Sequence, residues 1–306
     1  MPRWLVLTAL SALLFGVNAA LIEVPEKFVR PPFPMTLGYV VWSGTMLLCA
    51  GIALRRVGWR LERGPRALAH GSAVGLLGSA GTILWFAALR GGPAYLVVPI
   101  VSLYPVVTVV LAVWLLGERT RWPAALGVVL ALAAIVLLSL PEPDGGPARG
   151  GPWLAWSLCA LFMFGAQGWL VKASGGALGE ESLFFYMAAA AAALAPVAWG
   201  MTDFRQPINW GWTGPGLTAA IQLPNAVGAL LSIYAYRAGK VILVGPIIGL
   251  YPLVTIVLSL ALYRRVPGPA LLAGMALALV AIALIAVAEA VPGAPKPRPP
   301  ESHGTR

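Results

Sequence analysis

The sequence has few of the residues from which most enzyme and metal sites are built. Two cysteines and two histidines occur among 306 residues, and charged residues make up 10% of the chain, against about 25% in a soluble domain. Cys49 and Cys159 fall in apolar runs, which indicates core residues rather than a disulfide or a metal site. His70 and His303 are poor candidates for general-base chemistry, and P-loop, HExxH and GxSxG motifs are missing. The sequence therefore predicts no metal, no cofactor and no enzymatic activity.

The chain is instead rich in long apolar runs. Hydrophobic residues form 59% of the chain. Windows of about 18 or more residues, long enough to cross a hydrocarbon core of about 30 Å as a helix, recur along it. Ten such runs predict an all-α membrane protein with ten transmembrane helices. The runs cover approximately residues 3–22, 34–54, 68–89, 94–116, 123–140, 152–173, 181–200, 214–237, 241–263 and 268–290.

The two ends of the chain carry different signals. The first run has a basic start and small residues after it, as a signal peptide does. However, FGVNAALIE from Phe15 is echoed by FGAQGWLVK from Phe164, where cleavage makes no sense, so we expect a retained helix. Residues 291–306 are rich in proline and polar residues, a composition that predicts a disordered tail.

The formal net charge of +10 does not indicate a nucleic-acid partner, because the basic residues fall in the loops between apolar runs. The lipid bilayer is the expected partner. Assigning successive loops to alternate sides puts 14 of the 21 Lys and Arg residues on one side. This predicts a multi-pass protein of the plasma (inner) membrane with both termini cytoplasmic. That side holds Arg3, Arg55, Arg56, Arg60, Arg63, Arg66, Arg119, Arg121, Lys172, Arg237, Lys240, Lys296, Arg298 and Arg306.

One segment of the chain occurs twice. LYPVVTVVL begins at Leu103 and LYPLVTIVL begins at Leu250, with seven of nine positions identical at an offset of 147 residues. Chance similarity between apolar helices is the alternative, but Tyr-Pro followed by Thr, among matched Gly and Arg positions, favours a duplication. The predicted units are residues 1–140 and 150–290. Further pairs at the same offset are Tyr39/Tyr186, Gly81/Gly228, Arg90/Arg237, Gly92/Gly239, Pro99/Pro246 and Gly127/Gly274.

Each unit contains five of the ten predicted helices. Because five is odd, a helix and its counterpart in the other unit must cross the membrane in opposite directions. The two five-helix repeats are therefore expected to have inverted topology. Inverted repeats recur in secondary transporters, where the substrate site lies near the bilayer midplane between them.

The chain resembles the EamA-type transporters of the drug/metabolite transporter superfamily over nearly its whole length. The resemblance rests on FGVN and FGAQ in the first and sixth helices, and on AALRGGPAYLVVPIVSLYPVVTVVLAVWLLGERT with its second copy AYRAGKVILVGPIIGLYPLVTIVLSLALYRR. Gly117-Glu118 matches a recurring family signature, whereas the second copy has Arg264 and Arg265 there. The second helix also lacks the basic residue that many members carry. Members move amino acids, metabolites, drugs or nucleotide sugars, so the resemblance implies transport of a small molecule.

Prolines interrupt both copies of the repeated segment. A proline within a span leaves a backbone carbonyl without its helical partner, which is costly in hydrocarbon unless that carbonyl faces protein or a wet cavity. The helices that carry these prolines are therefore expected to face the interior, and a packing kink without ligand contact is the alternative. The expected helix breaks are Pro99, Pro105, Pro246 and Pro252.

Polar and aromatic side chains within the spans are the candidate substrate contacts. A buried tyrosine hydroxyl needs a partner or water, whereas a threonine can bond its own helix. Gln222 and Asn225 stand where the first unit has Gly75 and Gly78, so they either fit an asymmetric ligand or make hydrogen bonds between helices. The candidates are Asn18, Tyr39, Trp85, Tyr104, Thr108, Gln167, Tyr186, Gln222, Asn225, Tyr251 and Thr255.

Glu23 and Lys172 occupy matched positions at the ends of the first and sixth spans. Ionisable groups within a span suggest function, but both side chains are also long enough to reach the interface. Lys172 is a candidate for substrate contact or gating, and Glu23 for coupling or gating.

The sequence favours a secondary transporter that exports small organic metabolites, amino acids or drugs by alternating access. The alternative is an intramembrane lipid-modifying enzyme, which would place its polar groups at one interface rather than in mid-span. The expected partners are a small-molecule substrate and the bilayer. A monomer suffices for the site, with a homodimer as the alternative.

Overall fold

Every regular element in the described part of the chain is a helix. The computed structural model describes residues 2–91, 97, 100–138, 152–263 and 268–290. The expected break at Pro99 and the expected tail at 291–306 lie outside these residues. The elements are α1 (Arg3–Leu21), α2 (Val24–Lys27), α3 (Met35–Arg56), α4 (Pro65–Gly91), α6 (Tyr104–Leu115), α7 (Trp122–Leu138), α8 (Trp153–Ala173), η1 (Ser174–Gly176), α9 (Glu180–Gly200), η2 (Trp212–Gly216), α10 (Leu217–Ala238), α11 (Val241–Gly249), α12 (Tyr251–Tyr263) and α13 (Pro269–Ala290).

Six of the described helices have the length and hydropathy of a membrane span. The prediction of an all-α, multi-pass membrane protein is confirmed at this level. The six helices are Arg3–Lys27, Met35–Arg56, Pro65–Gly91, Trp153–Gly176, Glu180–Gly200 and Trp212–Ala238. Four shorter apolar helices accompany them in the same part of the chain: Ile100–Leu115, Trp122–Leu137, Val241–Thr255 and Leu272–Ile285.

Large apolar side chains cover the outside of the bundle. Leu48, Trp114, Val129 and Phe162 are each more than half exposed. In water such a surface would promote association, but it suits lipid, whose chains are as apolar as the side chains they meet. The buried core instead contains many alanines, and such small residues let helices approach one another closely.

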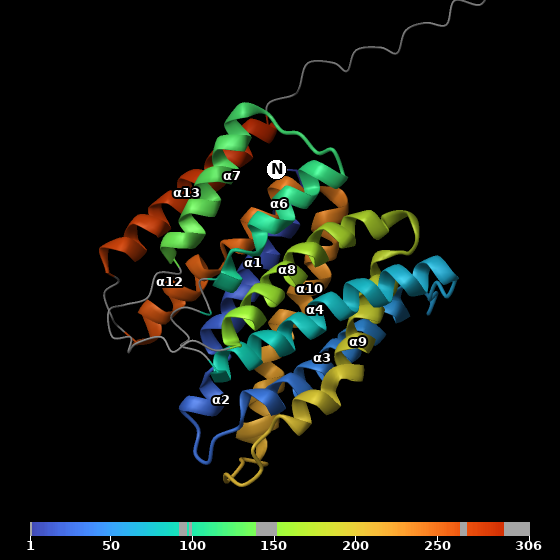
Figure 1. Ribbon diagram of the computed structural model, residues 1–306, viewed down its shortest axis with the longest axis vertical. Helices are drawn as coiled ribbons and strands as arrows, with labels where there is room; N and C mark the ends of the chain where they lie inside the picture. Colours follow the sequence, from blue (N-terminus) through green and yellow to red (C-terminus); the bar gives the residue numbers. More distant parts are fainter. Residues whose placement is uncertain (1, 92–96, 98–99, 139–151, 264–267, 291–306) are drawn as a thin grey trace, which may run out of the picture.

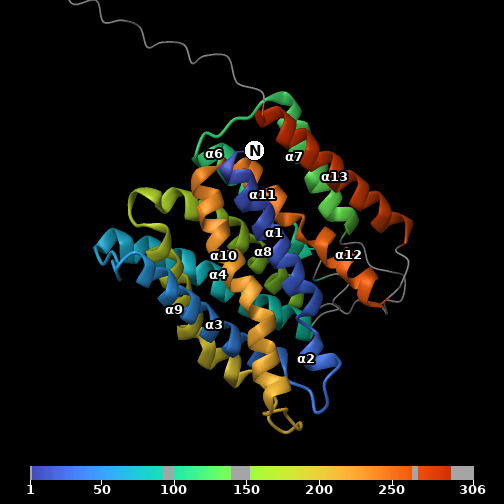
Figure 2. The same cartoon turned by 180° about the vertical axis from the view of Figure 1, so that it is seen from behind.

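The helices of the two units pair across the molecule, as Figure 1 and Figure 2 show from opposite sides. α1 packs against α10 and α12, and its repeat counterpart α8 packs against α4 and α6. The counterparts α3 and α9 pack against each other, as do α7 and α13. Each of these contacts joins an element of the first unit to an element of the second. The core is therefore shared between the units rather than built separately within each.

Each copy of the repeated segment contains a helix break, and the two breaks have the same backbone geometry. Leu103 has φ −78° and ψ 1°, and Leu250 has φ −83° and ψ 6°. The next helix then starts at a tyrosine followed by a proline, so Pro105 and Pro252 lie in a first turn. A missing N–H costs little there, because the first N–H groups of a helix have no intrahelical partner.

Pro246 does not break a helix, contrary to the sequence-based expectation. It lies inside α11, which continues through it to Gly249. Its missing N–H removes one intrahelical bond, to the carbonyl of Ile242. Packing compensates for that loss, because every residue of α11 is buried. The helix instead ends before Leu250. The residue after Leu250 is Tyr251, whose backbone conformation is restricted by the following Pro252.

The repeated threonines join the two units at glycines. Thr108 of α6 donates a hydrogen bond to the carbonyl oxygen of Gly165 in α8, and Thr255 of α12 donates one to that of Gly16 in α1. A Cβ atom would come within 2.8 Å of a facing backbone oxygen at Gly16 and within 2.9 Å of one at Gly165. Only glycine lets the helices approach this closely.

Candidate functional site

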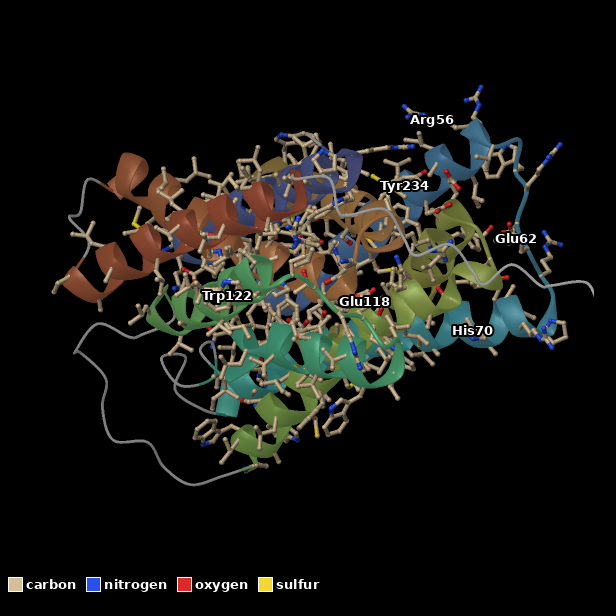
Figure 3. The ribbon with its side chains drawn as sticks, turned by 90° about the horizontal axis from the view of Figure 1, so that it is seen from above. Arg56, Glu62, His70, Glu118, Trp122 and Tyr234 are labelled. Atoms are coloured by element: carbon tan, nitrogen blue, oxygen red, sulfur yellow. The ribbon has the colours of Figure 1, made fainter. Side chains whose placement is uncertain are left out.

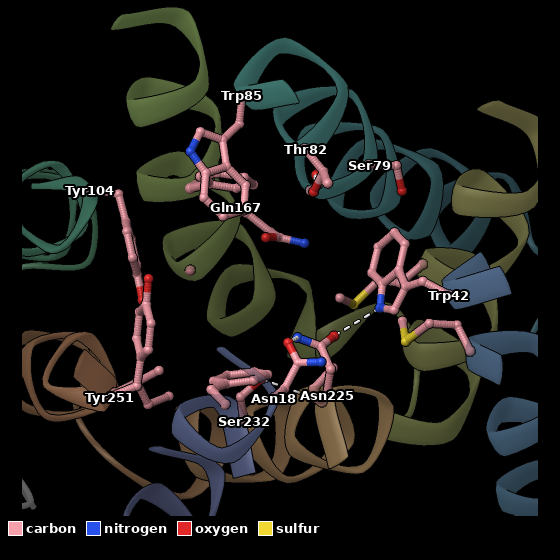
Figure 4. A pocket seen from close by; sticks show the side chains of 18 of the residues that line it. Asn18, Trp42, Ser79, Thr82, Trp85, Tyr104, Gln167, Asn225, Ser232 and Tyr251 are labelled. Carbon is pink, nitrogen blue, oxygen red and sulfur yellow. Dashed lines mark hydrogen bonds between the residues drawn. The ribbon is translucent and has the colours of Figure 1, made fainter. Parts of the chain in front are cut away.

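A cavity of about 300 Å³ lies between the two units. Its walls come from α1, α3, α4, α8 and α10, and from the tyrosines that follow the two helix breaks. Small-molecule sites commonly start at about this size. Figure 4 shows polar and aromatic side chains arranged around one open space. Eight of the side chains proposed from the sequence line it: Asn18, Tyr39, Trp85, Tyr104, Gln167, Gln222, Asn225 and Tyr251.

A chain of hydrogen-bonded amides forms one wall of the cavity (Figure 4). The indole N–H of Trp42 donates to Asn225 Oδ1 at 2.8 Å, and Asn225 Nδ2 donates to Asn18 Oδ1 at 3.3 Å. Asn18 Nδ2 in turn donates to Gln222 Oε1 at 3.0 Å and to the carbonyl oxygen of Ile221 at 2.9 Å. These bonds tie α3, α10 and α1 together.

The direction of this amide chain is fixed at both ends. An indole nitrogen only donates, so Trp42 requires the oxygen of Asn225. A backbone carbonyl only accepts, so Ile221 requires the nitrogen of Asn18. The Gln222 oxygen is then committed to Asn18, and its amino group has no hydrogen-bond partner among the described residues. The wall therefore presents N–H groups to the cavity.

Aromatic rings form another part of the lining. Figure 4 shows Tyr104 and Tyr251 pointing toward each other, with Trp85 nearby. Tyr104 and Phe164 meet edge to face, with their ring centroids 6.2 Å apart. A side pocket of about 60 Å³ opens among these rings. The indole nitrogen of Trp85 is buried and has no partner in the described structure.

The repeat-related residues Tyr39 and Tyr186 lie in different environments. Tyr39 is almost fully buried and lines the cavity. Tyr186 lies outside the lining: its ring covers Gly71, and its hydroxyl donates to the carbonyl oxygen of Glu62 at 2.7 Å. The counterpart of Gly71 is Thr218, so α10 carries a side chain at the position where α4 leaves room for the ring of Tyr186. The two tyrosines therefore differ in environment although the repeat relates them.

Thr108 and Thr255 do not line the cavity either. Their hydroxyls bond to the carbonyl oxygens of Gly165 and Gly16, and each also lies 3.3 Å from the carbonyl oxygen one turn earlier in its own helix. The structure places them at the joints between the units, away from a solute in the cavity.

Glu23 and Lys172 also lie away from the cavity. Glu23 pairs with Lys27 at 2.7 Å on the surface. Lys172 Nζ donates to the backbone oxygens of Arg237 and Gly239 at 3.0 and 2.6 Å, so it anchors the connection between α10 and α11. No Asp, Glu, Lys or Arg side chain lines the cavity among the described residues. No cluster of three or more potential metal ligands occurs in the same part of the chain.

Several polar lining residues are not among the candidates proposed from the sequence. Trp42 lies three positions after Tyr39, and Thr82 lies three before Trp85, so each shares a helix face with a candidate. Helical periodicity from these candidates would have found them. The polar lining residues that the sequence analysis missed are Trp42, Ser79, Thr82, Ser232 and Tyr236.

The units are joined at one end of the bundle by contacts of Glu62, which follows α3 (Figure 3). The Glu62 carboxylate accepts hydrogen bonds from the hydroxyl of Ser182 and from the backbone N–H of Gly179. Burial alone would raise the pKa of Glu62. The hydrogen bonds from Ser182 and from the backbone N–H groups of Glu62 and Gly179, together with the charge of Arg237, outweigh burial and lower that pKa. The ionised form is thus favoured at this contact.

A second set of contacts joins the units at the opposite ends of α3 and α9. The hydroxyls of Thr36 and Thr202 are 2.7 Å apart, and Arg90 Nη1 donates to the carbonyl oxygen of Met201 at 2.7 Å. The two units therefore touch at both ends of the bundle, with the cavity between them.

Comparison with known proteins identifies the family. The sequence pattern of the EamA-like transporter family matches residues 2–140 and 151–287. The chain belongs to the EamA-like transporter family. This match confirms the resemblance seen in the sequence, and it falls on both copies of the repeat. The multi-pass helical structure fits membership in this family of membrane transporters.

Two further similarities are consistent with this EamA-like assignment. An uncharacterized protein of Methanocaldococcus jannaschii is 29% identical over 140 residues, which are 46% of this chain and 98% of that protein. A crystal structure that is 21% identical has a TM-score of 0.75, and the match covers 95% of this chain and 99% of the other. The second similarity shows that the fold is shared.

Proposed function

We propose that the protein is a secondary transporter that moves a small organic solute through the cavity between its two units. The observation that carries the proposal is the position of the cavity, which lies between the repeats and beside the helix breaks at Leu103 and Leu250. Secondary transporters commonly bind substrate where discontinuous helices meet at a repeat interface. Membership in the EamA-like transporter family supports the same class of function.

The proposed membrane arrangement is ten transmembrane helices in two inverted repeats, residues 1–140 and 150–290. Reciprocal packing supports it, since α1 contacts α10 and α12 as α8 contacts α4 and α6. The relative from Methanocaldococcus jannaschii, nearly all of which matches 140 residues of this chain, also supports a repeat of that size. The six long and four shorter apolar helices would supply the ten crossings.

Alternating access requires contacts that break at one end of the cavity while contacts at the other end hold. Glu62 with Ser182 provides such a contact between the units at one end, and Thr36 with Thr202 provides one at the other. Each is made of a few hydrogen bonds, worth about 1 kcal/mol for a neutral pair and about 1.5–3 kcal/mol for a bond to the charged Glu62. A bound solute would shift the equilibrium between the state open at one end and the state open at the other only if it binds the two states with different affinities.

The orientation is part of the proposal. The last turn of α3 carries Arg55 and Arg56, and the loop after it carries Arg60, so the Glu62 end would face the cytoplasm of a plasma (inner) membrane with both termini inside. Net transport would be export of metabolites, amino acids or drugs.

The test is transport by the purified protein in liposomes. Vesicles are loaded with a panel of radiolabelled amino acids, nucleosides, aromatic amides, organic cations and organic anions, and their release is compared with that from protein-free vesicles. Faster release of at least one solute supports the proposal. No release under either a pH gradient or a concentration gradient, together with conversion of a lipid into product, would favour the lipid-modifying enzyme and overturn it.

A further inference from the structure

We propose that the central cavity selects an uncharged molecule that combines a flat ring with a hydrogen-bond acceptor, such as a carboxamide oxygen. This inference rests on the proposed transport function and narrows its substrate class. It follows from three properties of the described lining residues: they carry no charge, they include N–H groups without an acceptor, and several of them are aromatic.

The cavity offers no counter-charge to an ionised ligand. None of its described lining residues is Asp, Glu, Lys or Arg, and the sequence of residues 92–99, GPAYLVVP, contains none either. Glu23 and Lys172 are engaged elsewhere, with Lys27 and with backbone oxygens. An ion that leaves water for such a site loses its hydration without gaining a partner of opposite charge, which is costly.

The amide wall contains N–H groups that have no described acceptor. The oxygens of Asn225, Asn18 and Gln222 each already accept a bond. The amino group of Gln222 and one N–H of Asn225 have no described acceptor. A donor left unpaired in a buried site is unfavourable, so a ligand that brings an acceptor to these N–H groups gains free energy there.

The rings favour a flat partner. Trp85, Tyr104, Phe164 and Tyr251 line both the main cavity and its side pocket. Aromatic side chains hold a second ring by stacking or edge-to-face contact, worth about 0.5–1.5 kcal/mol per pair beyond area burial. A ring in this region and an acceptor on the amide wall would occupy the two distinct parts of the lining.

Three compounds of nearly the same shape but different charge test whether the cavity selects an uncharged ligand. Benzamide is uncharged, benzoate is an anion and benzamidine is a cation at neutral pH, and all three have the same number of non-hydrogen atoms. Binding of radiolabelled benzamide to the purified full-length protein is measured by scintillation proximity, with unlabelled benzoate and benzamidine as competitors. Benzamide is expected to bind at least tenfold more tightly than either ion.

A single substitution tests the role of the amide donors. Gln222→Glu keeps the oxygen that accepts from Asn18 and replaces the free amino group with a carboxylate oxygen of similar size. The variant should lose benzamide affinity and should prefer benzamidine, with the ratio of the two affinities changing by at least tenfold. The matched control is Gln206→Glu, the same change on an exposed residue outside the cavity, and it should leave the ratio unchanged.

Several outcomes overturn this inference. Equal or tighter binding of benzoate or benzamidine by the unmodified protein contradicts the uncharged class, and an unchanged ratio in a correctly folded Gln222→Glu protein contradicts the assigned donor. Failure of all three compounds to bind also overturns it. In each case the transport assay with charged solutes decides separately whether the protein is a transporter, so the two proposals fail independently.

Discussion

The hydroxyl of Thr108 donates a hydrogen bond to the carbonyl oxygen of Gly165 at 3.0 Å, and this bond is repeated on the other side of the molecule by Thr255 and Gly16 at 3.1 Å. Each bond joins a helix that follows a break to a helix of the other unit. The motif that is duplicated in the sequence therefore joins the units. Each copy bonds to a glycine in the first helix of the other unit, Thr108 to Gly165 and Thr255 to Gly16.

A methyl group at Gly165 should loosen one of these joints. Gly165→Ala places a Cβ within 2.9 Å of the carbonyl oxygen of Tyr104, and relieving such a contact costs about 1–3 kcal/mol. The expected result is a lower unfolding temperature in detergent, measured by tryptophan fluorescence. Gly44→Ala is the control, since nothing lies within 4 Å of a Cβ there. Equal unfolding temperatures for the two variants would contradict the close approach.

Thr108→Val should separate stability from solute binding. It keeps the shape of the side chain and removes the hydrogen bond to Gly165, so we expect a loss of about 1 kcal/mol in unfolding free energy. Thr108→Ser keeps the hydroxyl and should lose less of this bond. Because Thr108 does not line the cavity, the relative transport rates of different solutes should not change. A change in solute preference in Thr108→Val would place this residue in the binding site after all.

The two end contacts should have opposite effects on access to the cavity. Ser232 lines it, so Ser232→Cys, in a protein whose two native cysteines are replaced, reports access to membrane-impermeant thiol reagents. Glu62→Gln is expected to raise labelling from the cytoplasmic side, and Thr202→Val from the other side. Rates are measured in inside-out and right-side-out vesicles. Increased labelling from the same side in both variants would argue against alternating access, and the reverse pattern would reverse the proposed orientation.

Acid should weaken the Glu62 contact. Because the folded state holds the pKa of Glu62 below its ordinary value of 4.5, its carboxylate stabilises the fold above that value, and the contribution is lost as pH falls through the folded pKa. The difference in unfolding temperature between the unmodified protein and Glu62→Gln is therefore expected to shrink between neutral pH and about pH 3. A difference that is constant over this range would mean that Glu62 does not titrate in the folded contact.

Trp42→Phe should weaken solute recognition without loss of the fold. The change removes the donor that fixes the amide of Asn225, which is then free to turn. We expect KM for a transported solute to rise about fivefold, the equivalent of about 1 kcal/mol, with kcat little changed. Trp210→Phe, on an exposed indole, is the control. A fall in kcat without a rise in KM would indicate a role in the conformational change instead.

The sequence predicts the duplicated fold well because the repeated letters have direct structural meaning. Leu103 and Leu250 adopt the same backbone conformation, and the tyrosines that follow them point toward each other in the cavity (Figure 4). Apolar runs identify the spans because lipid requires them whatever their packing partners. The break expected at Pro246 was wrong, because packing around α11 decides whether a proline ends a helix or is accommodated in it.

The site is predicted less completely, because a span's sequence does not show which helix face meets the cavity. Thr108 and Tyr104 are one turn apart, yet Tyr104 lines the cavity and Thr108 reaches the backbone of α8. Tyr186 was grouped with Tyr39 through the repeat. In the structure, however, the ring of Tyr186 packs against α4 at Gly71, where there is no side chain. Such differences depend on the residues of a facing helix, which only the folded structure brings together.

The unequal walls of the cavity have a genetic consequence. An assembly of two identical half-length chains would carry the same residues on both sides, so a glycine at one position would be a glycine at its counterpart. Joining the copies in one chain frees the second gene segment to vary, and here Gly75 and Gly78 correspond to Gln222 and Asn225. Fusion thus allows one wall to keep close helix contact while the other carries the polar side chains that we propose discriminate among solutes.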